Sequence, residues 1–133
     1  MIPEFNDHGY LPPGIHPATL DEITERFGTE SELRRVQMES LRWMIELAWK
    51  AGVLQIVVNG SFVTDKYEPN DVDCVLLVGP DYPQDPIADS ELQSGLPFIT
   101  MELGNRKRFA EFTQMIFATD RDEFPKGLIE VLP

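Results

Sequence analysis

Two aspartates separated by one residue are the strongest chemical signal in this chain. Asp71 and Asp73 open an apolar segment, 74–78, that has the composition of a β-strand. Side chains at positions i and i+2 of a strand project from the same face, so the two carboxylates are expected side by side. Two ionised carboxylates at that spacing repel each other, and a divalent cation relieves the repulsion. Mg²⁺ prefers carboxylate oxygens and keeps positions for water and substrate phosphates. The pair therefore predicts a site for one or two Mg²⁺ ions.

A Gly-Ser pair precedes the aspartates and suggests the ligand. Gly60 and Ser61 end the β-branched run 54–59, which predicts a buried strand. A glycine lets the backbone approach a phosphate closely, and the serine adds a hydroxyl. We therefore predict that Gly60 and Ser61 contact a phosphate group, with Lys66 and Lys126 as weaker candidates for a cationic contact.

Each of these features also has a plainer interpretation. A Gly-Ser pair after a strand is a common turn, and Asp71 in an Asn-Asp pair can simply begin a strand. Asp73 is harder to explain in this way, because a carboxylate inside an apolar strand is costly unless it has a partner. The functional interpretation depends on the combination of the two motifs.

The rest of the chain supplies elements that can position them. Residues 1–18 are rich in proline and glycine and predict an irregular arm. Capping-box patterns beginning at Thr19 and Thr29 predict a short helix ending at Gly28 and a long helix ending at Gly52. The apolar stripe of the long helix is expected to lie in the core, and it comprises Leu33, Val36, Leu41, Met44, Ile45 and Ala48. Further predictions are a strand over 71–78, a broken helix over 89–103, and strands over 108–117 and 128–131.

The order strand, Gly60-Ser61, polar connection, Asp71-x-Asp73 resembles the nucleotidyltransferase superfamily, which includes DNA polymerase beta and the minimal nucleotidyltransferases. The resemblance implies an α+β fold, with a mixed sheet and helices packed mainly on one side, in a single domain over 1–133. It implies metal-dependent transfer of a nucleotidyl group from a nucleoside triphosphate. Gly60 and Ser61 would meet the triphosphate, and Asp71 and Asp73 would hold the metal. Active members use a third carboxylate from a later strand, for which Glu111 is the candidate and Glu102 its rival.

A closer resemblance covers most of the chain. The segments FNDHGYLPPGIHPATLDEITERFG, GSFVTDKYEPNDVD and TDRDEFPKGLIEV are similar to an uncharacterised bacterial family of small nucleotidyltransferase-like proteins. This resemblance supports the fold and implies no particular substrate.

Charge and composition limit the partners. A net charge of −12 opposes non-specific binding to nucleic acid, which needs a basic surface. The single cysteine excludes an internal disulfide, and no apolar run is long enough to span a membrane, so a cytoplasmic protein is expected. Two functions stay open. One is an enzyme acting on a protein, RNA or small-molecule hydroxyl. The other is an antitoxin-like regulatory partner, with weak or no catalysis, of a protein encoded nearby.

Overall fold

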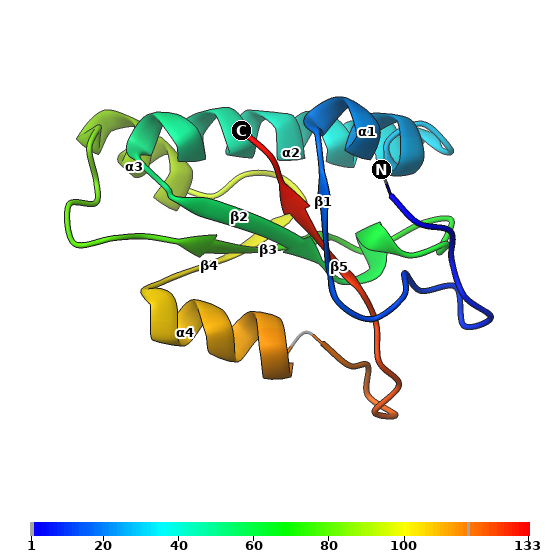
Figure 1. The fold of residues 1–133 in the computed structure, drawn as a ribbon. Helices are drawn as coiled ribbons and strands as arrows, with labels where there is room; N and C mark the ends of the chain where they lie inside the picture. The colour runs from blue at the N-terminus through cyan, green and yellow to red at the C-terminus, as the bar shows by residue number, and fades with distance from the viewer. Residues whose placement is uncertain (1, 117) are drawn as a thin grey trace.

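A five-stranded mixed sheet forms the centre of the computed structural model, which describes residues 2–116 and 118–133 (Figure 1). The sheet order is β1-β5-β2-β3-β4, with β1 and β5 parallel, β3 and β4 parallel, and the other neighbours antiparallel. The strands are β1 Ile15–Ala18, β2 Gln55–Asn59, β3 Val72–Leu77, β4 Ile99–Gly104 and β5 Leu128–Val131. The strands predicted over 54–59, 71–78 and 128–131 are therefore confirmed.

Four α-helices flank the sheet within the described residues. Helices α1 Leu20–Phe27, α2 Glu32–Ala51 and α3 Pro86–Gln93 cover one face, and α4 Arg106–Glu111 lies on the other (Figure 1). Thr19 caps α1 through the predicted capping box, while Ser31 caps α2, which ends at Gly52 in the left-handed region. Helices thus cover mainly one side, as expected. None of the helices in the described part of the chain combines the length and the apolar character needed to cross a bilayer.

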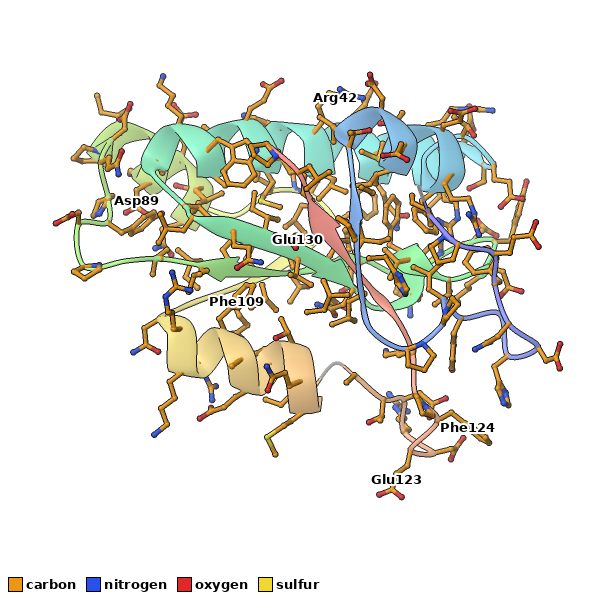
Figure 2. All side chains as sticks on the ribbon, viewed as in Figure 1. Arg42, Asp89, Phe109, Glu123, Phe124 and Glu130 are labelled. Atoms are coloured by element: carbon orange, nitrogen blue, oxygen red, sulfur yellow. The ribbon has the colours of Figure 1, made fainter. Side chains whose placement is uncertain are left out.

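Apolar side chains pack on both faces of the sheet. The larger core lies under α1, α2 and α3 and includes the buried Cys74, whose burial raises the pKa of its thiol. The smaller core lies under α4, where Phe109 and Phe112 pack against Val57 and Val75. Figure 2 shows Phe109 between α4 and the sheet. Since alternate residues of β3 enter different cores, Asp73 shares the α4 face with Val75.

The segment 86–117 differs most from its prediction. The helix expected over 89–103 is wrong for its second half, because Ile99, Met101 and Leu103 form strand β4 and pack against the larger core. The strand expected over 108–117 is also wrong. Asn105 caps α4, which continues as a π-helical turn over Phe112–Ile116, and residue 117 lies outside the described residues. The three-residue spacing of Phe109 and Phe112 puts both rings on the same helix face.

The irregular arm contains one strand that composition did not indicate. Residues 15–18 form the edge strand β1, which pairs in parallel with β5. Pro17 is compatible with this position because an edge strand leaves some of its backbone donors without ladder partners. The arm therefore joins the sheet instead of only lying against it.

The buried face of α2 begins differently from the predicted stripe. Val36 is 47% exposed, whereas Arg34 and Gln37 are 1% and 0% exposed. The Arg34 guanidinium donates hydrogen bonds to the backbone carbonyls of Phe27, Phe62, Thr64 and Lys66. A buried cation therefore ties α2 to the turn that follows Gly60.

Candidate functional site

The Gly-Ser turn and the Asp-x-Asp pair meet at one end of strands β2 and β3. The antiparallel register places Asn59 opposite Asp73, so Gly60 follows directly beside the aspartate. A Cβ atom on Gly60 would collide with the Asp73 carboxylate and would lie 3.0 Å from its Cγ. Gly60 has φ 80° and ψ −165°, a conformation that is essentially restricted to glycine. Both the backbone conformation and the close approach of Asp73 therefore require glycine at position 60.

Gly60→Ala is expected to lower the free energy of unfolding by about 3 kcal/mol, from backbone strain and from the collision with Asp73. Gly95→Ala is the matched control, since Gly95 has φ 91° and open space where a Cβ would sit. It should cost only about 1 kcal/mol. Urea unfolding measures both values, and equal costs would contradict the close approach of Gly60 to Asp73.

The two carboxylates lie on neighbouring parts of the same sheet face. Asp71 accepts a hydrogen bond from the Thr100 hydroxyl of β4 at 3.2 Å, and the register pairs Thr100 with Asp73. Burial raises the pKa of Asp73, the charge of Asp71 raises it further, and Lys126 partly opposes the shift. The ionised form of Asp73 is thus destabilised at a position where a bound cation would stabilise it.

The raised pKa of Asp73 predicts a specific pH dependence in the absence of divalent cations. The folded protein holds this proton to higher pH than the unfolded chain does, so stability falls as pH rises from the usual aspartate range through the raised pKa. Asp73→Asn cannot lose that proton. Its stability advantage over the wild type should therefore grow between acid and neutral pH. Urea unfolding in the presence of a chelator tests this, and an advantage that is constant with pH would contradict it.

A cavity of about 680 Å³ opens between this strand end and the loop 118–127. Its lining combines the Gly-Ser turn, two aspartates, two cations, two polar side chains and one isoleucine. The lining residues are Asn59, Gly60, Ser61, Asp73, Ile116, Thr119, Asp120, Arg121 and Lys126. Asn59 is 0% exposed, and neither its amide nitrogen nor its amide oxygen has a hydrogen-bond partner. The cavity therefore presents both charge signs and an unsatisfied amide.

The loop that carries Arg121 and Lys126 is fastened to the N-terminal arm. The Tyr10 hydroxyl donates to Asp120 at 2.7 Å, an interaction that raises the pKa of Tyr10 and lowers that of Asp120. The Gly127 amide donates to the Leu11 carbonyl. At the outer tip of the loop, which Figure 2 shows with Phe124, the Phe124 ring packs on His8. The arm thus sets the position of one wall of the cavity.

The predicted site residues divide into two groups. Gly60, Ser61 and Asp73 line the cavity, and Asp71 lies beside it on the same face. The Lys66 side chain is exposed, and the backbone carbonyl of Lys66 accepts a hydrogen bond from the Arg34 guanidinium. Its ammonium is not part of the described lining.

The two candidates for the third carboxylate lie on different elements. Glu111 lies on α4 instead of a strand, and it forms an ion pair with Arg108 at 3.3 Å. Glu102 lies on β4, beside Val75 in the neighbouring strand and two residues beyond Thr100. No cluster of three or more His, Cys, Asp or Glu side chains suited to a metal occurs within residues 2–116 and 118–133. The structure brings two carboxylates together and leaves the third position open.

Sequence reasoning offered Lys126 as a weak cationic candidate and did not assign five other lining residues to the site: Asn59, Ile116, Thr119, Asp120 and Arg121. Asn59 carried little signal, because an Asn-Gly pair after a strand is a common turn. Arg121 carried none, since it lies in a charged loop far along the chain.

The fold and cavity define a small α+β protein with a polar, charge-bearing pocket at the ends of its central strands. The chain belongs to DUF6932, a family of unknown function, which matches residues 3–132. Comparison with curated proteins and with solved structures finds no match.

Proposed function

We propose that this protein is a Mg²⁺-dependent nucleotidyltransferase. It would move a nucleoside monophosphate from a nucleoside triphosphate to a hydroxyl of a protein, RNA or small-molecule acceptor. The observation that carries the proposal is the contact of Gly60 with Asp73, which joins the phosphate-binding motif and the carboxylate motif in one cavity. Neither motif would suggest the activity alone.

The residues present fit a divalent cation. Asp73 is half-buried beside Asp71, and the two like charges disfavour ionisation of Asp73. Asp71 and Asp73 would hold the ion, with the Thr100 hydroxyl orienting the Asp71 carboxylate. A bound Mg²⁺ supplies positive charge that offsets the negative charge developing on the transferred phosphoryl group.

The other residues would bind and orient the substrate. Gly60 lets the Asp73 carboxylate lie against the backbone at the cavity wall, and Ser61 offers a hydroxyl on the same wall. Arg121 and Lys126 add positive charge on the opposite wall, which favours a polyanionic ligand in a chain of net charge −12.

The experiment is an incubation with each of four labelled nucleoside triphosphates and Mg²⁺. It is run with and without the protein encoded beside this one, and with Asp71→Ala and Asp73→Ala as comparisons. Label transfer that requires Mg²⁺ and disappears in both variants supports the proposal. Absence of transfer from all four nucleotides, under every acceptor condition, counts against catalysis.

A second function is favoured by the position of Glu111. Its ion pair with Arg108 on α4 leaves two gathered carboxylates, which suit ligand binding better than efficient transfer. In this alternative, the protein is an antitoxin-like regulatory partner that acts by contact. Partner binding that is unchanged in Asp71→Ala and Asp73→Ala, with no label transfer, would support it.

A further inference from the structure

The floor of the cavity contains an amide that the fold leaves without a partner. Asn59 is fully buried at the end of β2, and both polar atoms of its side chain lack hydrogen bonds. An unsatisfied buried amide costs free energy, so such groups in folded proteins call for an explanation. The neighbours of Asn59 on the same sheet face are the apolar Val57 and Val75 and the carboxylate of Asp73, and its amide forms a hydrogen bond with none of them.

The position of Asn59 connects this cost to the cavity. It lines the cavity together with Gly60 and Asp73, and the β2–β3 register places it directly beside Asp73. Paired residues in an antiparallel ladder present their side chains on the same face. Asn59 therefore faces the space in which a ligand of Asp73 would lie.

The charge of the ligand follows from the opposite wall. Lys126 lines the same cavity and interacts electrostatically with both Asp73 and Asp120. A cation on that wall and an amide donor on the floor together favour an anionic oxygen acceptor. The phosphate groups of a nucleotide meet this requirement and also suit a neighbouring metal-binding carboxylate.

We infer that Asn59 is a substrate-binding residue whose side-chain amide donates a hydrogen bond to a phosphate group held between it and Lys126. This inference rests on the proposed function for the identity of the ligand, a polyphosphate. The hydrogen bond that the fold withholds from Asn59 is then supplied by the substrate. The unliganded protein carries the cost, and binding relieves it.

The test compares stability with binding in Asn59→Val, with Asn59→Ala as a second variant if valine disturbs the strand. Removing the unsatisfied amide should raise the midpoint of thermal unfolding by about 3 °C or more in the absence of ligand. Affinity for Mg²⁺ with inorganic tripolyphosphate, and for Mg²⁺ with the four nucleoside triphosphates, should fall about 10-fold or more by calorimetry. Tripolyphosphate separates recognition of the phosphates from recognition of a base.

Two further variants complete the comparison. Gln37→Met removes another buried amide that has one unsatisfied atom, but Gln37 lies away from the cavity and donates to the Pro69 carbonyl. It should lower stability and leave affinity unchanged. Lys126→Met should weaken tripolyphosphate binding about 10-fold without the gain in stability.

The outcomes separate this inference from the proposed function. Unchanged binding in Asn59→Val, with binding lost in Asp73→Asn, overturns the inference and leaves the proposed function standing. Binding that depends on Asn59, without transfer in any assay, overturns catalysis and supports the inference. A wild-type protein that binds none of these probes overturns both.

Discussion

Arg34→Met is expected to lower the free energy of unfolding by about 4 kcal/mol, the largest loss of stability that we predict for a single substitution. The guanidinium is 1% exposed and is the donor to four backbone carbonyls, of residues 27, 62, 64 and 66. Methionine fills similar space and donates nothing, so these carbonyls lose their buried partner. Burying the guanidinium charge has a desolvation cost, which also lowers the pKa of Arg34. Methionine avoids that cost, but the loss of the hydrogen bonds is expected to be larger.

Arg35→Met provides the matched control, because Arg35 is the exposed neighbour on the same helix. It should change stability by no more than about 0.5 kcal/mol. Chemical denaturation of both variants measures the difference. Similar small losses in the two would show that the Arg34 hydrogen bonds do not hold the turn after Gly60.

Arg34 also illustrates a limit of sequence reasoning. Apolar spacing predicted that Leu33 and Val36 would begin the buried face of α2, but the helix is rotated so that Arg34 and Gln37 face inward. Three of the four carbonyls that bind Arg34 belong to residues about thirty positions away, and the fourth belongs to Phe27. Their need for a donor exists only in the folded chain, so no local pattern could reveal it.

The errors over 86–117 have two causes. Ile99, Met101 and Leu103 alternate as a strand requires, and Gly95 and Pro97 between α3 and β4 are helix stop signals that the prediction over 89–103 did not apply. Phe109 and Phe112 fit a helical period, but the same stretch alternates well enough to suggest a strand. The helical period prevails over 106–116 because the apolar residues on the second face of the sheet need a cover, and α4 provides it.

The core of the site could be predicted because its determinants are local. A glycine before a turn and two aspartates at strand spacing have fixed geometry, and the antiparallel pairing of β2 and β3 brings them together. Lys126 and Asn59 depend on tertiary structure. The loop of Lys126 is positioned by Tyr10 from the opposite end of the chain. Glu111 was selected for its place in a predicted strand, and that strand is a helix.

Asp73→Asn is expected to lower kcat/KM for nucleotidyl transfer about 1,000-fold, which corresponds to about 4 kcal/mol of transition-state stabilisation. The amide keeps the shape of the side chain beside Gly60 but removes the charge that would hold Mg²⁺. Affinity for Mn²⁺, used as a spectroscopic substitute for Mg²⁺, should fall with it. The control is Asp81→Asn, an exposed aspartate beyond the other end of β3, which should retain full activity.

The stability of the same variant makes the test decisive. Damage to the fold would lower activity and stability together. Asp73→Asn should instead be more stable than the wild type without divalent cations, because burial and Asp71 both disfavour the ionised carboxylate. A side chain whose removal costs activity and improves stability is retained for binding or catalysis. Loss of activity accompanied by loss of stability would assign Asp73 a structural role, and the proposed metal site would fail with it.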